Sequence, residues 1–449
     1  MEHESTAVVV GGGWSGIAAA WYLRRAGYAV SVLDEADAPG GRSATRWLGS
    51  RPVCLGGKNI GTRYRLFREF AAELGATDFQ HFGINSSRID HGTIRTVDGT
   101  AKLRAALGYL LRTRPADTLR FLRLVRLIRD DERNKFLGGP GFGALADLPL
   151  DAVFGSYLLE QLIRPVTVRM NGAEPGEMYL RNFGANLGML LDSFDQLAGG
   201  FEPVFTRIAR CVDWRARHRV RRLVAAGGTA TGVEAAGPDG RSLTVDADVV
   251  VIAVPARGAA GLVTGLDPDL GELLDGIPYF PAAVAVVGYD RDVFTDRVRG
   301  LVFPPDSPLS NAGAYGAHDL NLVRYTFSGA AARPLLDGDT DLVAVAEDRL
   351  RPYLPVPAGP RQVVATRWSQ AFCAYGGGHP ERLLRIKERL KGISGLGLAG
   401  DYIRGASIEA CFRSAHECVR DLVSRRTRPG PSPVTTESPG GSLESPGRP

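Results

Sequence analysis

The stretch VVVGGGWSGIAAAWYLRRAGYAVSVLDEADAPGGR (8–42) decides the fold of this chain. Its pattern predicts a short strand at 7–10, a helix from Ile17 to Arg25 and a second strand at 28–33, with a glycine-rich turn after the first strand. Alternation of strand, helix and strand is typical of a parallel βαβ unit. We therefore expect an α/β protein built on a parallel sheet.

The glycine-rich turn has the spacing GxGxxG, formed by Gly11, Gly13 and Gly16, with Trp14 and Ser15 between the last two. In a dinucleotide-binding turn the first glycine allows the sharp bend, the second lets the backbone approach a pyrophosphate, and the third lets the helix pack on the strand. The helix N-terminus then presents unpaired N–H groups to that pyrophosphate. We interpret the turn as a nucleotide site; a glycine-rich turn without a ligand is the alternative.

Two further features of the same stretch extend the site. Asp34 ends the second strand about twenty residues beyond the glycines, where a carboxylate accepts hydrogen bonds from a ribose, and Glu35 follows it. Gly41 permits a close backbone approach, and the planar guanidinium of Arg42 can neutralise a pyrophosphate. An NAD site does not need this second element, whereas FAD sites commonly have it. FAD is therefore the expected cofactor.

The chain beyond this unit changes character several times. Apolar residues have helical spacing from about 60 to 195, strands are predicted within 220–254, 282–289 and 320–328, and a helix at 381–393 precedes a strand and a last helix from about 407 to 424. We expect a discontinuous Rossmann-type FAD-binding domain plus a mixed-sheet substrate domain with a helical cap. The expected segments are 1–60, 196–262 and 381–424 for the FAD-binding domain, 61–195 and 263–380 for the substrate domain, and 425–449 for a disordered tail.

Composition excludes several classes of protein. The 449 residues are 44% hydrophobic and 23% charged, as in ordinary globular proteins. No apolar run approaches the roughly 18–20 residues of a membrane span, and the N-terminal residues do not resemble a secretory signal. The five cysteines are scattered without a CxxC pair, which argues against a disulfide framework and a metal site. We expect a cytoplasmic protein without a metal.

The formal net charge of +5 comes from 49 Arg and five Lys against 49 Asp and Glu. This charge is too diffuse to predict nucleic-acid binding. Residues 102–135 are richer in basic than acidic residues and interleave them with apolar ones. A cap helix with a solvated arginine face is one interpretation, and a weak contact with an anionic membrane surface is the other.

Both ends of the sequence resemble the flavin-containing amine oxidase superfamily, which includes protoporphyrinogen oxidases and phytoene desaturases. The matching stretches are residues 8–42 and GLGLAGDYIRGASIEACFRSAHECVRDL (395–422). Between them RWSQAFCAYGGGHPERLLRI (367–386) is similar to the segment before the last flavin strand in the protoporphyrinogen oxidase branch. The resemblance implies FAD and an oxidoreductase activity.

The C-terminal block supplies further candidates for the cofactor site. Gly400 and Asp401 follow a strand, so Asp401 can bond to the ribityl or pyrophosphate part of FAD. Ser407 and Ile408 open a helix whose N–H groups can face the N1/O2 edge of the flavin. The resemblance also implies that the backbone of Val220 contacts the adenine.

The segment LGGKN (55–59) is expected, by the same resemblance, to run along the flavin, with Gly56 and Gly57 giving close approach. Lys58 is a candidate active-site base, or a donor to a water near the flavin, if its neighbours lower its pKa. A surface lysine, or a lysine on the pyrophosphate side, is the alternative.

Four further residues have weaker support. Trp368, Tyr375 and Tyr402 are candidates for aromatic walls of the site or for core positions. His379 precedes a predicted helix, where a capping role suits it better than acid–base chemistry.

The resemblance implies oxidation of a CH–NH or CH–CH bond of a small molecule, with hydride transfer to flavin N5 and O2 as the acceptor. Asp34 stands where the family usually has Glu, and Trp14, Lys58 and Cys373 also depart from its pattern. These departures favour specialised metabolism, such as antibiotic biosynthesis, over the haem pathway. A redox-neutral isomerase or mutase and a non-enzymatic escort-like module of the same fold are the alternatives.

Overall fold

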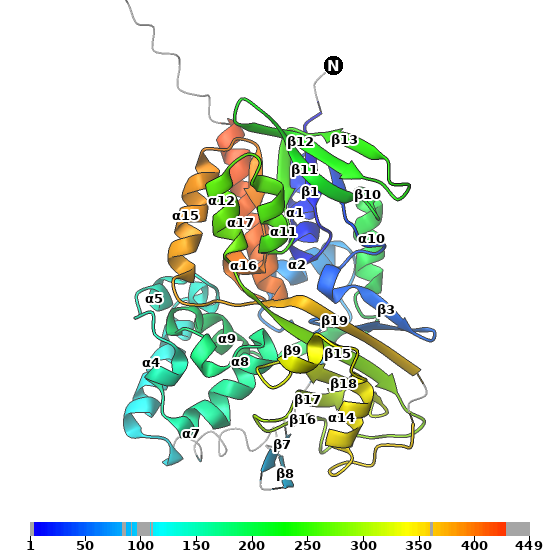
Figure 1. The fold of residues 1–449 in the computed structure, drawn as a ribbon, viewed down its shortest axis with the longest axis vertical. Coiled ribbons are helices and arrows are strands. Elements are labelled where there is room, and N and C mark those ends of the chain that lie inside the picture. The colour runs from blue at the N-terminus through cyan, green and yellow to red at the C-terminus, as the bar shows by residue number, and fades with distance from the viewer. Residues whose placement is uncertain are drawn as a thin grey trace, which may run out of the picture.

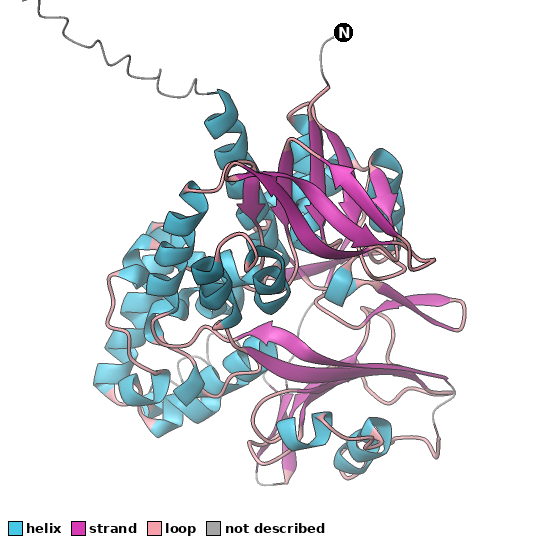
Figure 2. Cartoon of the chain, turned by 45° about the horizontal axis from the view of Figure 1, so that its top comes forward, coloured by secondary structure: helices cyan, strands magenta, loops and turns pink. Residues whose placement is uncertain are grey.

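The computed structural model of this chain describes residues 4–82, 87–90, 92–96, 108, 111–359 and 362–427. Its strands form two groups, and most of the helices gather to one side of them (Figure 2). In Figure 1 the upper group contains the parallel sheet, the lower right holds a larger sheet, and helices α4 to α9 fill the lower left. The α/β class predicted from the sequence is confirmed.

The parallel sheet has the strand order β10-β2-β1-β14-β20, and every neighbouring pair in it is parallel. In β1, Ala7 and Val9 pack into one core while Val8 and Val10 pack into another, because successive side chains point to opposite faces. Both faces are covered, which explains why these strands are apolar runs. The five strands are β1 (Thr6–Val10), β2 (Ala29–Leu33), β10 (Asp213–Arg215), β14 (Val249–Ile252) and β20 (Leu396–Leu398).

Helices cover one face of this sheet, and helices together with a small sheet cover the other. The first group is α1 (Trp14–Arg25), α2 (Arg65–Glu73), α10 (Glu202–Cys211) and α17 (Ile408–Thr427). The second is α11 (Ala256–Val263), α12 (Pro268–Asp275) and α15 (His379–Lys391), with the antiparallel strands β11 (Arg219–Ala226), β12 (Thr229–Ala236) and β13 (Ser242–Asp246).

The C-terminal end of the fold differs slightly from the prediction. Helix α17 continues to Thr427, so its last turn includes the first three residues of the predicted tail. The rest of that tail, 428–449, lies outside the described residues.

A second, seven-stranded sheet has the order β19-β15-β18-β17-β16-β7-β8. Its pairs are antiparallel except β16 with β7, so the predicted mixed sheet is present. Helices α13 (Arg333–Leu336) and α14 (Leu342–Leu350) pack on one face, and the other face lines a cavity. The strands are β7 (Ser87–Asp90), β8 (Thr93–Thr96), β15 (Tyr279–Gly288), β16 (Gly300–Val302), β17 (Leu309–Ala314), β18 (Leu322–Phe327) and β19 (Gln362–Cys373).

The segment expected to be a helical cap is only partly helical. Its helices are α4 (Pro115–Asp130), α5 (Pro140–Gly143), α6 (Leu150–Val153), α7 (Ser156–Leu158), α8 (Arg164–Asn171) and α9 (Gly184–Leu190), and a π-helical turn at Leu159–Ile163 joins α7 to α8. The same segment also supplies β7 and β8 to the large sheet and contributes to a small one, β5 (Ile60–Gly61), β9 (Phe194–Leu197) and β6 (Phe79–His81). Short polar strands of two to four residues carry too little periodicity to be predicted.

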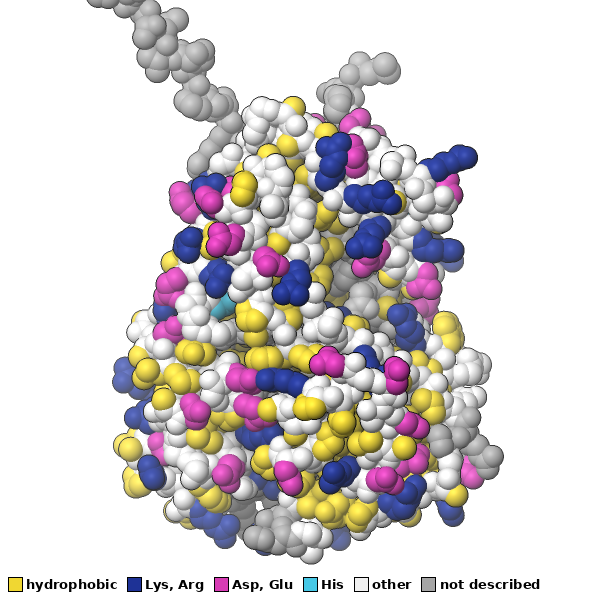
Figure 3. All heavy atoms as spheres, in the orientation of Figure 1, with side chains coloured by type: hydrophobic (Ala, Val, Ile, Leu, Met, Phe, Trp, Pro, Cys, Tyr) yellow, Lys and Arg dark blue, Asp and Glu magenta, His cyan; other side chains and the backbone are white. Residues whose placement is uncertain are grey.

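The surface shown in Figure 3 has basic and acidic side chains interspersed, with apolar side chains denser in the lower half. Among the helices that the structure describes, none combines the length and the apolar character needed to cross a bilayer.

Candidate active site

One large cavity joins the β1–α1 turn of the parallel sheet to the cavity-lining face of the seven-stranded sheet. Its volume of about 1740 Å³ exceeds the roughly 300–1,000 Å³ of a typical small-molecule site. Residues from both ends of the chain and from both sheets line it. The cavity can therefore hold a dinucleotide and a second molecule together.

The three glycines of the turn have two different environments. A β-carbon on Gly16 would lie 1.8 Å from the carbonyl oxygen of Gly11, and Gly11 itself has a positive φ of 97°. These two positions are therefore required by the close packing of turn, helix and strand. A β-carbon on Gly13 would have no neighbour within 4 Å, so the backbone there is open to the cavity.

Helix α1 begins directly at this opening. The first amide groups of a helix lack intrahelical acceptors, and in α1 these belong to Trp14, Ser15 and Gly16. Open backbone at Gly13 beside unpaired amides is the donor set that a pyrophosphate requires. The residues present therefore fit the dinucleotide predicted from the sequence.

The side chains of Trp14 and Ser15 pack against neighbouring side chains in the core. Trp14 lines the cavity, but its ring packs against Phe67 and Phe201 with centroids 5.4 and 4.8 Å apart. Ser15 is buried. Their expected role in cofactor binding therefore rests on their backbone amides.

Asp34 lies at the end of β2 and lines the cavity, as the ribose assignment requires. Its carboxylate accepts hydrogen bonds from the backbone amides of Gly12 and Ala36, the latter at 2.7 Å. Burial raises the pKa of this carboxyl, and the two amide bonds oppose the rise. Glu35 also lines the cavity, but its side chain is 71% exposed and lies 3.6 Å from Arg219.

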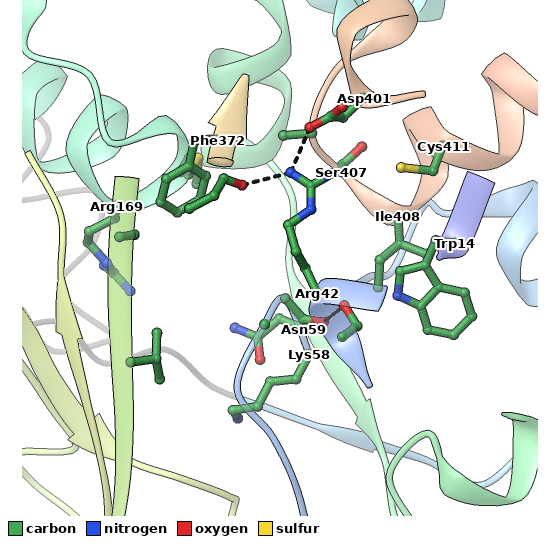
Figure 4. A pocket seen from close by; sticks show the side chains of 18 of the residues that line it. Trp14, Arg42, Lys58, Asn59, Arg169, Phe372, Asp401, Ser407, Ile408 and Cys411 are labelled. Atoms are coloured by element: carbon green, nitrogen blue, oxygen red, sulfur yellow. Dashed lines mark hydrogen bonds and ion pairs between the residues drawn. The ribbon is translucent and has the colours of Figure 1, made fainter. Parts of the chain in front are cut away.

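Arg42 and Asp401, predicted from opposite ends of the chain, contact each other (Figure 4). The guanidinium donates to Asp401 Oδ2 at 2.8 Å and to the Ala371 carbonyl at 2.7 Å, and the hydroxyl of Tyr279 donates to Asp401 Oδ1 at 3.0 Å. The Asp401 side chain is only 4% exposed, whereas that of Arg42 is 34% exposed. Arg42 therefore neutralises a buried carboxylate and still faces the cavity beside Gly41.

The start of helix α17 lies on the cavity at Ser407 and Ile408, and Gly400 lines the cavity nearby. The hydroxyl of Ser407 accepts the amide of Ala410 at 3.1 Å, a bond typical of a helix N-cap. Val220, on β11, also borders the cavity.

Glu409, the next residue of α17, points into the core instead. Its side chain is 2% exposed and accepts the amides of Leu66 and Phe67, each at 3.0 Å. A residue of the last helix therefore caps the start of α2, and burial raises the pKa of its carboxyl. Sequence reasoning missed this role because the two helices are more than 300 residues apart.

The Gly56–Lys58 loop follows β4 (Arg51–Cys54), which pairs with β3 (Thr45–Leu48), and borders the cavity. A β-carbon on Gly56 would lie 2.1 Å from the Arg42 carbonyl oxygen, so this glycine permits close packing of the two loops. A β-carbon on Gly57 would meet nothing within 4 Å, so the backbone there is open.

Lys58 lines the cavity, where both the active-site role and the position on the pyrophosphate side remain predictions. Its ammonium donates to the Tyr315 carbonyl and lies 4.5 and 4.6 Å from the ring centres of Phe82 and Tyr315. Burial lowers the pKa of Lys58 to about 7, helped by the positive charges of Arg324 and Arg299. A lysine in this state can hold or release a proton near neutral pH.

The four candidates with weaker support fall into two groups, one that lines the cavity and one that is buried in the core. Trp368 lines the cavity. Tyr375 and Tyr402 are buried in the core, and the hydroxyl of Tyr375 donates to the Asp401 carbonyl at 3.0 Å. His379 begins α15 and its Nε2 lies 2.8 Å from the Tyr402 carbonyl oxygen, while burial lowers its pKa to about 4. Tyr375, Tyr402 and His379 are therefore structural.

Sequence reasoning did not identify three residues on the sheet side of the cavity: Arg169 on α8, Arg324 on β18 and Phe372 on β19. The sequence pattern could have identified Arg324 as a candidate site residue, because it is the one charged residue in the otherwise mostly apolar strand LVRYTF (322–327). Arg169 and Phe372 carry no comparable signal.

Comparisons with known proteins agree with this geometry. Residues 14–423 match the sequence model of the flavin-containing amine oxidoreductase family. Coproporphyrinogen III oxidase of Mycobacterium tuberculosis is 25% identical over 456 residues, which cover 92% of this chain and 96% of that protein. Polyamine oxidase 2 of Arabidopsis thaliana is 25% identical over 280 residues, which cover 59% of this chain and 54% of that protein.

Among solved structures, cyclohexylamine oxidase from Brevibacterium oxydans has the same fold, with a TM-score of 0.71 at 19% identity over 95% of this chain and all of that one. The resemblance and the cofactor predicted from the sequence are confirmed. Because the family match spans nearly the whole chain and coincides with a cavity built for a dinucleotide, this protein belongs to the flavin-containing amine oxidoreductases and is an FAD-dependent oxidoreductase.

Proposed function

We propose that this enzyme oxidises a CH–NH or CH–CH bond of a small organic substrate that binds between the dinucleotide site and the seven-stranded sheet. The observation that carries the proposal is the continuity of the cavity, which reaches from the β1–α1 turn to that sheet with about 1740 Å³ of space. FAD supplies the two-electron acceptor, at flavin N5, for a hydride leaving a substrate carbon. The protein places that carbon and keeps water away from it.

The residues proposed to hold FAD line the cavity, except Gly16, which packs against the Gly11 carbonyl oxygen. The open backbone at Gly13 and the first amides of α1 face the pyrophosphate, Asp34 accepts from the ribose, and Val220 contacts the adenine. The remaining cofactor residues in this proposal are Gly11, Trp14, Ser15, Gly16, Glu35, Gly41, Arg42, Gly56, Gly57, Lys58, Gly400, Asp401, Ser407 and Ile408. The proposal also includes the domain boundaries predicted from the sequence, with the last FAD-binding segment extended to Thr427.

Lys58 is the proposed catalytic residue. Its ammonium is inside the cavity and its pKa of about 7 lets it accept a proton at Nζ near neutral pH. Such a group can take the second proton that leaves the substrate.

Three further elements belong to the proposal. The electron acceptor is O2, the setting is specialised metabolism of the antibiotic-biosynthesis kind, and the location is the cytoplasm. On the face that Figure 3 shows, basic and acidic side chains are interspersed, and this supports the proposal that the chain does not bind nucleic acid. The exposed Leu119 and Leu122 of α4, set among arginines, support a weak contact with an anionic membrane surface.

The test is anaerobic mixing of the purified flavoprotein with candidate substrates, followed by air. Coproporphyrinogen III, a polyamine and cyclohexylamine are the first compounds to try, because proteins named for them are similar to this chain. We expect bleaching of the flavin absorbance by a productive substrate and its return in air with consumption of O2. Conversion that needs prior reduction and consumes no O2 would instead establish the isomerase alternative.

A further inference from the structure

The end of the cavity next to the seven-stranded sheet is lined by basic side chains from three separate elements. Arg169 comes from α8, Arg324 from β18 and Lys58 from the loop after β4. Figure 4 shows Arg169 and Phe372 across the cavity from Trp14 and Ile408, with the Lys58 side chain extending toward the Arg169 side. This cluster lies on the part of the cavity away from the β1–α1 turn.

Arg324 is held in place without a carboxylate. Val323 and Tyr325, its neighbours on β18, pack into the core under α14, so alternation along the strand turns Arg324 toward the cavity. Its guanidinium donates to the carbonyl oxygens of Cys54 and Leu55 at 3.0 and 2.6 Å. These bonds orient the positive charge but leave it uncompensated.

The guanidinium of Arg169 has fewer polar contacts than that of Arg324. Among the described residues it makes no hydrogen bond or ion pair, although it lines the cavity. Burial lowers the pKa of its guanidinium, and the positive charge of Arg324 lowers it further. A guanidinium stays protonated at physiological pH, so Arg169 and Arg324 repel each other unless an anion lies between or beside them.

The carboxylates that line the described part of the cavity lie elsewhere. Asp34 and Glu35 are at the end of β2, and Asp401 is bonded to Arg42. Asp192 accepts from the Thr62 hydroxyl and the Ser193 amide, both at 2.9 Å. None of these four forms an ion pair with the cation cluster.

We propose that Arg169 and Arg324, with Lys58 beside them, bind a carboxylate of the substrate, so that the substrate is an organic anion and not an amine cation. A planar carboxylate matches the fork of N–H donors on arginine and would relieve the repulsion within the cluster. A protonated amine would add a further like charge to it. This inference rests on the function proposed above, because it identifies the substrate class of the same site.

The experiment is titration of the resting, FAD-loaded protein with three probes of one shape and different charge: phenylacetate, phenyl phosphate and 2-phenylethylamine. Binding is followed by calorimetry and by the shift of the flavin absorbance. We expect phenylacetate to bind at least tenfold more tightly than 2-phenylethylamine. Tighter binding of phenyl phosphate than of phenylacetate would overturn the assignment to a carboxylate.

The variants are Arg169→Gln, Arg169→Lys and, as a control, Arg126→Gln. Arg126 lies on α4 with its side chain 81% exposed and 3.3 Å from Asp130, so its loss removes the same charge outside the cavity. We expect Arg169→Gln to weaken phenylacetate binding at least tenfold, Arg169→Lys to restore part of it, and Arg126→Gln to leave it unchanged. Circular dichroism and flavin content check that the variants are folded.

Equal binding of phenylacetate by the wild-type protein and Arg169→Gln would refute the inference, as would equal or tighter binding of 2-phenylethylamine. Neither result depends on turnover. The bond oxidised and the acceptor are measured separately by flavin bleaching and O2 consumption, so failure here is distinguishable from failure of the proposed function.

Discussion

Exchange of Gly13 for alanine, compared with exchange of Gly16 for alanine, separates cofactor binding from folding. Both changes add one methyl group to the same turn. At Gly13 the methyl would enter open cavity, with no atom within 4 Å, whereas at Gly16 it would lie 1.8 Å from the Gly11 carbonyl oxygen. The two variants should therefore fail in different ways.

The free energy of unfolding of Gly13→Ala should stay close to that of the wild type. Gly13 has φ −74°, which alanine adopts without strain, and the reduced freedom of the unfolded chain contributes about 0.4–1 kcal/mol of stability. Gly13 is also the N-cap of α1, where alanine is less favourable than glycine by roughly the same amount. The two effects offset each other, so the net change is within about 1 kcal/mol.

Binding of FAD to Gly13→Ala should be weakened strongly. The methyl group would stand where the pyrophosphate approaches the first amides of α1, and each charge-assisted hydrogen bond lost costs about 1.5–3 kcal/mol. This corresponds to a dissociation constant roughly 10- to 100-fold higher.

Gly16→Ala should instead destabilise the fold. The added carbon must move by more than about 1 Å from a backbone oxygen, and overpacking of this kind costs about 2 kcal/mol or more. Urea unfolding of the apoproteins and FAD titration of the folded proteins measure the two quantities. Wild-type FAD affinity in Gly13→Ala, or wild-type stability in Gly16→Ala, would refute this account of the turn.

Three further changes test buried charged groups. Asp401→Asn removes the buried charge opposite Arg42 and keeps an acceptor for the Tyr279 hydroxyl. It should lower the free energy of unfolding by about 1–3 kcal/mol, less than for a fully buried pair because the Arg42 side chain is 34% exposed. An unchanged urea midpoint would contradict the buried ion pair. Folding lowers the pKa of Lys58 from 10.5 to about 7, so the unfolded chain binds more protons than the folded protein between these two pH values. The wild-type protein should therefore gain stability as the pH rises through that window, by at most about 1.4 kcal/mol per pH unit from this residue. In Lys58→Met this gain should be absent from urea unfolding measured at pH 7, 8 and 9, and parallel pH profiles of the two proteins would argue against the shifted lysine. Glu409→Gln replaces one of the two amide acceptors at the start of α2 by an amide donor and should lower the urea midpoint by the equivalent of about 1–2 kcal/mol, with wild-type stability as the refuting outcome.

The nucleotide part of the site could be proposed from the sequence because the residues proposed for it are close together in the chain. The turn, the helix start and the proposed ribose carboxylate lie within residues 8–42, and the physical demands on them are made by neighbours in the sequence. Arg42 and Asp401 were each predicted, but their contact was not. Their ion pair joins residues that are 359 positions apart in the sequence, and a periodic pattern within one segment cannot predict a contact with another.

The substrate side of the cavity was not predictable in the same way. A strand such as β18 shows which residues alternate, but its pattern does not say which face of the sheet meets the cavity. The side chain of Arg324 faces it because β18 lies between β15 and β17 with Val323 and Tyr325 turned toward α14. Arg169 lies on a helix and is about 155 residues before Arg324 in the sequence.

The amino-acid sequence by itself predicted the α/β class and FAD, and it supplied the residues that are proposed to face the nucleotide, since each depends on backbone geometry and polarity over a few tens of residues. Only the tertiary structure decided the rest. It joined two sheets around one cavity, lowered the pKa of Lys58 through burial in that cavity, made Glu409 a helix cap and brought Arg169 and Arg324 to the cavity without an ion-paired carboxylate. Burial and charge depend on which distant segments pack together, and that is a property of the whole fold.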